Sequence, residues 1–454
     1  MTPPPAQAQT SALTAPINLL AARPPWRHTF VSLQVRNFRL FATAHLVAVI
    51  ALWMQRIAQD WLVLELSGSV TAVGITVAMQ FAPSLLLMPL GGIVADRYSK
   101  RRILMISQGA AGLLATLMAV LSLTGGIAVW HIYAIAFVLG LVTVIDQPAR
   151  QVFVNELVGP AHLRNAISVN SSIFQLGGMI GPAVSGILIT AVGGGWAFAV
   201  NAVACCFTVV MLGCLRQGEL VRSTPVPRSK GQLREGLDYA LGKPTILWPA
   251  VMAAFISVFA MSLPVMMAAY ADNVFRSGAA GYGLLNTLVA VGALAGALAS
   301  TRRATLRLRT VIGAAGAYGA LLAVSSAAPS LPLFCAVMVM AGFAALTFLT
   351  SANQLVQTST NVLIRGRVMS LYIMVLIGGQ AIGGPLIGTL AEHLGAPWAM
   401  FIAGAVPAVA AAVIAVVLAR RGQLELKMDL RSRRRPLLIV QSRRSADAGL
   451  GPAH

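Results

Sequence analysis

The sequence has few charged residues, and acidic residues are the scarcest of them. Its 454 residues contain 33 Lys and Arg but only 13 Asp and Glu, so charged residues make up 10% of the chain. An ordinary soluble domain carries about 25% charged residues. The composition therefore excludes an ordinary soluble domain and indicates a chain that lies mostly within a membrane.

Cysteine is also rare, and familiar site motifs are missing. The four cysteines lie in apolar segments without a C-x-x-C spacing, so we expect neither a metal site nor a disulfide framework. The phosphate loop G-x-x-x-x-G-K-[ST] does not occur, and nothing in the sequence predicts ATP hydrolysis. We expect no cofactor and no catalytic residue, and therefore not an enzyme.

Apolar residues, by contrast, make up 57% of the chain. Twelve membrane helices of about 20 residues each would need about 240 mostly apolar residues, which this composition supplies. The sequence predicts an all-α polytopic membrane protein with 12 transmembrane helices in two six-helix bundles. The predicted spans are 38–66, 70–94, 103–124, 129–150, 167–192 and 196–215, then 245–271, 281–300, 308–328, 331–353, 367–393 and 396–419.

These runs divide the chain into five parts. The N-terminal residues are rich in Pro and Ala and contain no cleavable targeting signal, which predicts a disordered lead. The parts are a cytoplasmic lead at 1–35, an N-terminal bundle at 36–216, a central cytoplasmic loop at 217–244, a C-terminal bundle at 245–420 and a basic cytoplasmic tail at 421–454.

The basic residues are distributed by side of the membrane. All but two of the 33 Lys and Arg fall in the chain ends and in the loops on one side, the exceptions being Arg56 inside the first span and Arg276 in a loop on the other side. The positive-inside rule then predicts a multi-pass inner-membrane protein with both termini in the cytoplasm. The net charge of +20 follows from this topology, so nucleic acid is not an expected partner. The lipid bilayer is an expected partner, and the basic tail can rest on anionic lipid headgroups.

The two halves repeat one another. Residues 177–198 (GGMIGPAVSGILITAVGGGWAF) resemble residues 378–401 (GGQAIGGPLIGTLAEHLGAPWAMF), and Pro182 corresponds to Pro385 at the same offset that relates Arg164 to Arg367. Such a repeat predicts two related bundles about an axis along the membrane normal, with a cavity between them.

The loop after the second span reads GGIVADRYSKRR at 91–102. It resembles the signature loop of the major facilitator superfamily, which implies the fold of that superfamily and a latch for one conformational state. The alternative is a plain basic loop. In the second half Ser300 occupies the place of Asp96, so the second copy of the loop is degenerate. The latch residues implied by the resemblance are Gly92, Asp96, Arg97, Arg101 and Arg102, with Arg150 as the expected distant partner of Asp96.

The fifth span carries a motif of small residues. Gly177, Gly181, Pro182 and Gly186 are similar to the helix-5 motif of antiporters of the superfamily, with Ser168 and Ser185 in place of two glycines. The glycines allow close helix packing and the proline allows a bend. Generic helix packing is the alternative, and the resemblance favours export.

Further segments narrow the resemblance. The stretches NFRLF (37–41), WMQRIAQDWLV (53–63), DQPARQ (146–151) and NELVGPAHLRNAISVNS (155–171) look like the branch that holds enterobactin-type siderophore exporters and macrolide efflux proteins. The likeness covers about residues 36–420. It implies a secondary transporter of a small molecule that is driven by protons, and the expected oligomeric state is a monomer.

Polar residues inside the spans are the candidate cargo and coupling groups, because an uncompensated charge at mid-membrane costs about 2.5–3.5 kcal/mol. Gln55, Arg56, Gln59 and Asp60 form a stripe on the first span, where spacings of three and four bring side chains together. An Arg56–Asp60 ion pair that only neutralises itself is the alternative to a substrate site. Asp146, at the expected end of the fourth span, is a second candidate coupling acid, and an ion pair at a helix end is its alternative.

We therefore expect an exporter of an amphiphilic or hydrophobic small molecule, of the drug or siderophore class, that works by proton antiport and alternating access. An importer or facilitator of the same fold is one alternative. A membrane scaffold or receptor without transport is a more distant one.

Overall fold

The computed structural model describes residues 31–221, 232–300, 308–361, 364–419, 425–427 and 439–441. In this part of the chain, 12 helical segments are long and apolar enough to cross a membrane, which confirms the predicted all-α fold. The spans are Arg36–Ser67, Val70–Met88, Lys100–Leu123, Val129–Gly159, Asn165–Val192, Gly195–Gly213, Pro244–Val274, Gly278–Ser300, Leu308–Ser325, Leu331–Ser359, Arg365–Leu394 and Ala396–Leu418.

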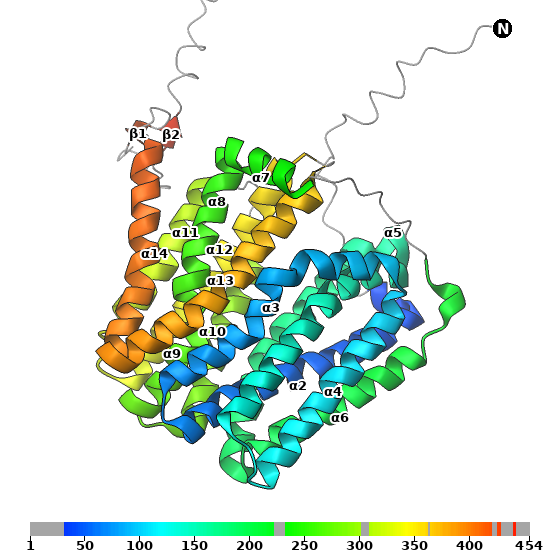
Figure 1. Cartoon of the computed structure of the whole chain (residues 1–454). Helices are drawn as coiled ribbons and strands as arrows, with labels where there is room; N and C mark the ends of the chain where they lie inside the picture. Colours follow the sequence, from blue (N-terminus) through cyan, green and yellow to red (C-terminus); the bar gives the residue numbers. More distant parts are fainter. Residues whose placement is uncertain are drawn as a thin grey trace, which may run out of the picture.

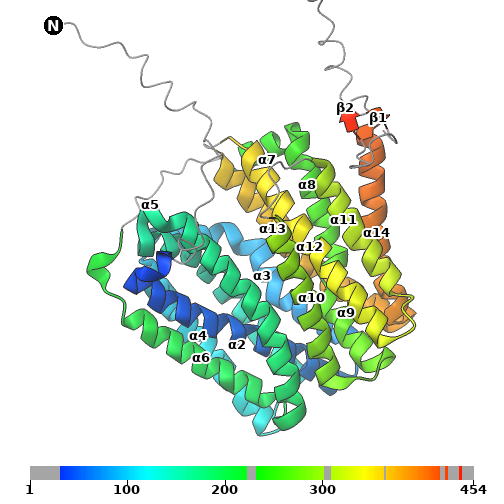
Figure 2. The same ribbon diagram turned by 180° about the vertical axis from the view of Figure 1, so that it is seen from behind.

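The helices form two bundles that lie side by side (Figures 1 and 2). Helices α2 to α6 make the N-terminal bundle, and α8 to α14 make the C-terminal one. The N-terminal helices are α2 (Arg36–Ser67), α3 (Val70–Arg97), α4 (Lys100–Leu123), α5 (Val129–Val192) and α6 (Gly195–Gly213). The C-terminal helices are α8 (Pro244–Phe255), α9 (Leu263–Ala269), α10 (Gly278–Ser300), α11 (Leu308–Ser325), α12 (Leu331–Ser359), α13 (Arg365–Leu394) and α14 (Ala396–Leu418).

The seventh span is irregular. It consists of α8, a π-helical turn η4 (Ile256–Ala260), α9 and a second π-helical turn η5 (Tyr270–Val274). Such turns are rare and are often found at functional sites.

An even number of crossings places the start of α2 and the end of α14 at the same end of the molecule, which we call the termini end; the opposite end is the far end. The end of α14 and the strands β1 (Glu425–Lys427) and β2 (Ile439–Gln441), which pair antiparallel, lie together with helix α7 (Gln232–Gly242) at this end of the C-terminal bundle (Figure 1).

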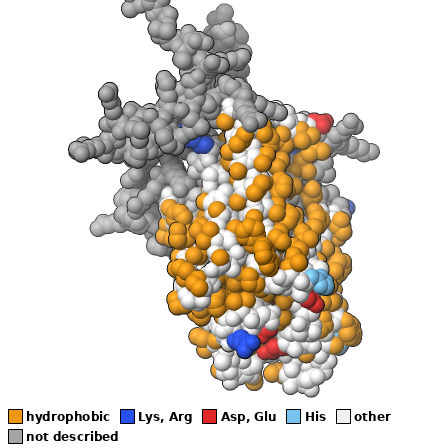
Figure 3. Space-filling model, turned by 90° about the vertical axis from the view of Figure 1, so that its left-hand side faces the viewer, with side chains coloured by type: hydrophobic (Ala, Val, Ile, Leu, Met, Phe, Trp, Pro, Cys, Tyr) orange, Lys and Arg blue, Asp and Glu red, His pale blue; other side chains and the backbone are white. Residues whose placement is uncertain are grey.

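The surface of the bundles is apolar, as a bilayer requires. Large side chains such as Leu86 and Ile106 are 72% and 73% exposed, and apolar side chains cover much of the face in Figure 3. With lipid outside, helices gain little from the hydrophobic effect when they associate, so their association depends on van der Waals contact between closely packed backbones. Glycine allows this close approach: a Cβ at Gly91 of α3 would collide with the carbonyl oxygen of Val144 in α5.

The fourth and fifth spans differ from the prediction. The sequence placed the end of the fourth span near residue 150, but α5 continues through the expected loop and changes direction only at Gly159, whose φ of 65° lies in the left-handed region. Phe153, Val154 and Leu157 keep this segment helical because they are buried against the first span and its neighbours. Asp146 therefore lies inside a helix and not at its end.

Two connecting segments are also more ordered than predicted. The last residues of the expected disordered lead form the short helix η2 (Val31–Gln34), where buried Ser32 donates through its backbone N–H and its hydroxyl to Asn165 Oδ1, at 3.0 Å and 2.7 Å. The central loop contains the short helix η3 (Gln217–Glu219) and α7. Residues 1–30 and most of the tail lie outside the described residues.

Candidate functional site

The polar stripe on α2 does not act as one unit, because its members point to different neighbours. Gln55 is 2% exposed and its Oε1 accepts a hydrogen bond of 2.6 Å from Asn201 Nδ2 of α6. Gln59 is equally buried. Gln55 thus joins two helices of the same bundle, a role that the spacing alone did not reveal.

Asp60 faces the other bundle. The hydroxyl of Tyr282, in α10, donates to Asp60 Oδ2 at 3.1 Å, and Asp60 is only 7% exposed. The indole ring of Trp61 stacks on the ring of Tyr282 with centroids 6.0 Å apart. A carboxylate of the first span is therefore hydrogen-bonded across the two halves of the molecule.

Arg56 forms no ion pair with Asp60, although both residues belong to the described part of the chain. Its guanidinium instead lies over the rings of Trp53 and Phe81, with its Cζ 5.3 Å and 5.8 Å from their centroids, and its buried Nε has no hydrogen-bond partner. The alternative of a direct Arg56–Asp60 ion pair is therefore not what the structure has: an Arg that precedes an acid by four residues is the weaker order, and the Asp60 carboxylate accepts from Tyr282 instead.

Arg56 also lies deep in the span. It is about 30 Å from the start of α2 at 1.5 Å per residue. This depth makes snorkelling to the termini end difficult. Cation–π contacts offset part of the cost of burying a guanidinium, but they leave the buried Nε–H of Arg56 without an acceptor.

A second polar cluster joins α2 and α5. The guanidinium of Arg150 binds both carboxylate oxygens of Asp146, with Nη2 2.9 Å from Oδ2, and its Nη1 lies 3.1 Å from Nδ1 of His45. His45 was not among the predicted site residues; its position on the polar side of α2 was the available signal. Arg150 is thus held by Asp146, while the side chain of Asp96, its expected partner, lies outside the described residues.

The signature loop is attached to the N-terminal bundle. Arg101 donates through Nε and Nη2 to the carbonyl oxygens of Leu212 and Gly213, both at 2.7 Å, and so satisfies the C-terminal end of α6. Lys100 pairs with Glu156 at 3.4 Å. Gly92 is half-buried, and Arg97 and Arg102 are exposed.

The small residues of the helix-5 motif pack against two different helices. A Cβ at Gly177 or Gly181 would collide with Val49 or Trp53 of α2, in the same bundle. Gly186 instead faces α10, where a Cβ would lie 3.1 Å from the Cα of Gly283. The backbone stays helical at Pro182, since Gly159 is the non-helical position inside α5.

Among the described residues, glycine contacts of this kind join the bundles at two helix pairs. The first is α5 on α10, through Gly186 and Gly283, and the second is α13 on α3, through Gly384 and Gly74 (Figures 1 and 2). Both involve the far-end halves of the helices. They are related by the internal repeat, because α13 is the counterpart of the second part of α5.

A carboxylate strengthens the second contact. Glu392, at the end of α13, accepts hydrogen bonds from the Ser69 hydroxyl at 2.5 Å and from the backbone N–H of Thr71 at 3.0 Å. It therefore caps the N-terminus of α3 from the other bundle. Sequence reasoning missed Glu392, Tyr282 and the Gly74–Gly384 contact, because no local pattern pairs residues so distant in the chain.

The described residues hold no cluster of three His, Cys, Asp or Glu side chains that could bind a metal ion. Two bundles of membrane helices related by a repeat, with charged and polar side chains buried inside the first, are the architecture of a transporter of the major facilitator type.

Comparison with known proteins identifies the branch. Residues 27–444 match the model of the transmembrane secretion effector family, and the chain belongs to this family of the major facilitator superfamily. It is 28% identical to the multidrug efflux pump Tap of Mycolicibacterium fortuitum over 82% of this chain and 92% of that protein. It is 25% identical to the enterobactin exporter EntS of Escherichia coli O1:K1 over 78% of this chain and 85% of that protein. The fold is similar to that of the nucleoside transporter NupG, with a TM-score of 0.66 at 12% identity over 84% of this chain and 99% of that one.

Proposed function

We propose that the protein exports an amphiphilic small molecule with an acidic or strongly polar group, and that Arg56 binds this group. The observation that carries the proposal is Arg56, a half-buried cation in a membrane span whose buried Nε donor has no partner and whose guanidinium lies over two aromatic rings. A cargo that brings an acceptor oxygen would satisfy the donor, while Trp53 and Phe81 would contact its apolar part. The similarity to an efflux pump and a siderophore exporter supports export.

Proton antiport is the proposed source of energy, with Asp60 as the coupling acid. Its hydrogen bond from Tyr282 is charge-assisted only while Asp60 is ionised. Protonation of Asp60 would weaken a contact between the two bundles and so favour a change of their relative position. Asp146 has a supporting role in this proposal, because it holds Arg150.

The proposed orientation places the termini end in the cytoplasm of a bacterial cell, as the positive-inside rule predicts. The far-end contacts of Gly74, Gly186 and Glu392 would then close the periplasmic side, and the structure would correspond to a state closed to the outside. In this proposal the signature loop, with Asp96, acts as the latch for the opposite state. A C-terminal reporter that is active only in the periplasm would refute the orientation.

The test of the function has two stages. First, a strain that lacks the gene is challenged with a panel of antibiotics and siderophores, with and without the protein, and a protected compound becomes the assay substrate. Second, transport of that compound is measured in inside-out vesicles with and without a pH gradient. Uptake that needs the gradient and is lost in Arg56→Gln supports proton-coupled export through Arg56.

The alternatives give different results. Transport that runs down the gradient of the compound in either direction, and does not depend on pH, would indicate a facilitator. Uptake into right-side-out vesicles driven by protons would indicate an importer. A scaffold or receptor would show no transport, and its buried polar residues could be replaced without loss.

A further inference from the structure

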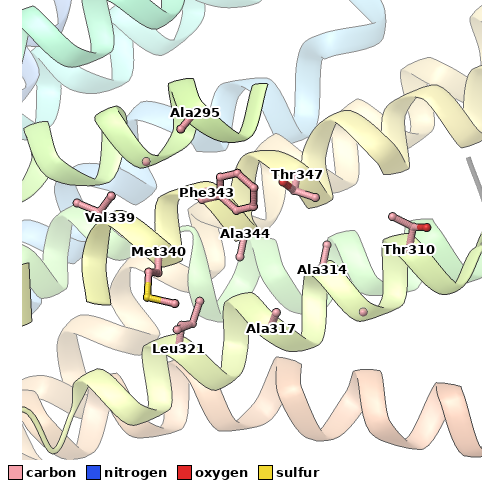
Figure 4. A pocket seen from close by; sticks show the side chains of 12 residues that line it. Ala295, Thr310, Ala314, Ala317, Leu321, Val339, Met340, Phe343, Ala344 and Thr347 are labelled. Atoms are coloured by element: carbon pink, nitrogen blue, oxygen red, sulfur yellow. The ribbon is translucent and has the colours of Figure 1, made fainter. Parts of the chain in front are cut away.

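An apolar groove lies on the outer surface of the C-terminal bundle, away from the polar residues of α2. Residues of α10, α11 and α12 line it, among them Ala295, Ala317 and Phe343, and its volume is about 510 Å³ (Figure 4). Met340 and Phe343 are 57% and 38% exposed, so the groove is open on the side that faces lipid. It falls within the range of about 300–1,000 Å³ that small-molecule sites have.

One end of the groove is polar. Thr310 lies at the termini end of the groove, because α11 begins at Leu308, and Thr347 lies farther along it, about level with Ala314 (Figure 4). Thr347 is 4% exposed, and its hydroxyl oxygen is buried without a hydrogen-bond partner. A buried hydroxyl without a partner is uncommon in proteins. A molecule bound in the groove can supply the missing partner.

The neighbouring charge is positive. Arg309 precedes Thr310 and is exposed at the same end of α11. A basic residue at the membrane surface attracts anionic headgroups. The groove thus combines an apolar body, a hydroxyl in need of a partner and a cation at one end.

The length and volume of the groove fit a lipid acyl chain better than a helix. From Thr310 to Leu321 the groove runs roughly 16 Å along α11 at 1.5 Å per residue. The hydrocarbon of one leaflet is about 15 Å thick, half of the bilayer core. A helix from a second copy of the chain is about 10–12 Å across, so 16 Å of it would occupy roughly 1,500 Å³ and could only rest on the rim.

We propose that the groove is a binding site for one acyl chain of an anionic phospholipid from the leaflet at the termini end. The chain lies between α10 and α11 on the surface of α12. A headgroup or ester oxygen accepts from the Thr347 hydroxyl, and Arg309 attracts the phosphate. This lipid is retained, whereas lipids elsewhere on the surface exchange. The site is independent of the proposed function, because neither Arg56 nor Asp60 contributes to it.

The test uses the full-length protein in phosphatidylcholine vesicles that contain a small fraction of phosphatidylglycerol with a photoactivatable diazirine in one acyl chain. After illumination, cross-linked peptides are mapped by mass spectrometry. We expect the labels to concentrate on the groove residues of α11 and α12. Labelling spread evenly over all lipid-facing helices would show ordinary boundary lipid and would overturn the proposal.

A filled groove provides the decisive variant. A Cβ at Gly313 would meet no atom within 4 Å, so Gly313→Leu can enter the groove without a backbone clash. We expect at least a fivefold loss of groove labelling. Gly109→Leu is the matched control, since Gly109 of α4 is exposed and equally open, and it should leave groove labelling unchanged. If Gly313→Leu does not yield folded protein, Ala317→Phe fills the same space. Unchanged labelling in a folded filled variant would contradict the site.

Two polar variants separate the headgroup contacts. Thr347→Val keeps the shape and removes the hydroxyl, and we expect at least a threefold loss of labelling. Arg309→Gln should abolish the preference for phosphatidylglycerol over phosphatidylcholine that carries the same diazirine chain. Wild-type labelling in Thr347→Val would contradict the polar contact. Cross-links between two copies through the groove, with a dimer mass in light scattering, would assign the groove to self-association and overturn the proposal.

Discussion

The two bundles bury different kinds of polar side chain. Among the described residues, those buried in the N-terminal bundle include Asp60, Gln55 and His45, while those buried in the C-terminal bundle are Ser, Thr and Tyr. Five of these C-terminal hydroxyls have no hydrogen-bond partner, those of Ser262, Tyr270, Thr347, Ser351 and Tyr372. Two related bundles have thus diverged in chemistry: the first holds charges and the second holds neutral hydroxyls. This difference suggests that the first bundle does the coupling, while the second offers an adaptable surface.

Among the variants, we expect Arg56→Gln to reduce transport most, and it tests whether the charged residues of the N-terminal bundle carry the function. If Arg56 donates to the cargo, its loss should cost about 2 kcal/mol or more, which reduces export at least about 30-fold. Arg56→Lys should also impair export, because it keeps the charge and loses the planar fork. The measurement is transport in vesicles, with the amount of folded protein checked by size-exclusion chromatography.

The control and the contrary outcome are specific. Arg276→Gln removes a cation from an exposed loop and should export normally. The double variant Arg56→Gln, Asp60→Asn removes both charges. Wild-type export by this double variant would show that the two charges only neutralise one another, and the charged bundle would lose its proposed role.

Tyr282→Phe tests the buried hydrogen bond that joins the Asp60 carboxylate of one bundle to a hydroxyl of the other. A hydrogen bond to a charged group contributes about 1.5–3 kcal/mol, so we expect transport to fall roughly tenfold and its pH dependence to change. Tyr318→Phe is the matched control, because the Tyr318 hydroxyl donates to the Ala260 carbonyl at 2.8 Å within its own bundle. Equal transport by the two variants would mean that the bond between the bundles has no special role.

Asp96→Asn compares the two copies of the signature loop, since Ser300 occupies this place in the second half. We expect the transport cycle to slow about fivefold while insertion and folding stay nearly intact, because a helix-end carboxylate is worth about 1 kcal/mol. Asp238→Asn, on the surface of α7, removes an exposed acid and serves as control. A wild-type transport rate in Asp96→Asn would refute the latch.

Tyr372→Phe should have the smallest effect on transport. The Tyr372 hydroxyl is buried without a partner in a residue that is 2% exposed, so its removal should stabilise the fold by about 1 kcal/mol and change transport less than about twofold. Thermal unfolding in detergent gives the first value and the vesicle assay the second. A loss of transport as large as that of Arg56→Gln would remove the contrast between the bundles.

The number of spans could be predicted because a bilayer requires about 20 mostly apolar residues for every crossing, and apolar runs such as 396–419 meet this requirement locally. The end of the fourth span could not be predicted from the sequence. Its continuation to Gly159 depends on Phe153 and Leu157, which are buried by helices distant in the sequence. The prediction failed where tertiary packing decided the local structure.

The candidate site shows the same division. Spacing on α2 correctly brought Arg56 and Asp60 within one helical turn, but it could not show that Asp60 turns to Tyr282, 222 residues away, or that Arg56 turns to Trp53 and Phe81. The contact of Glu392, in α13, with Ser69, at the start of α3, is a further example, since no local pattern connects the two residues. Tyr282 and Glu392 belong to the other half of the chain from the residues that they contact.

The sequence by itself determined the membrane environment, the 12 spans, the repeat and the residues whose burial would be costly, because hydropathy, charge and spacing act along the chain. Which polar groups meet depends on how the helices pack. Hydrogen bonds and ion pairs require contact distances, and in this protein the contacts between bundles are set by glycines, such as Gly74 and Gly384, that let distant helices approach.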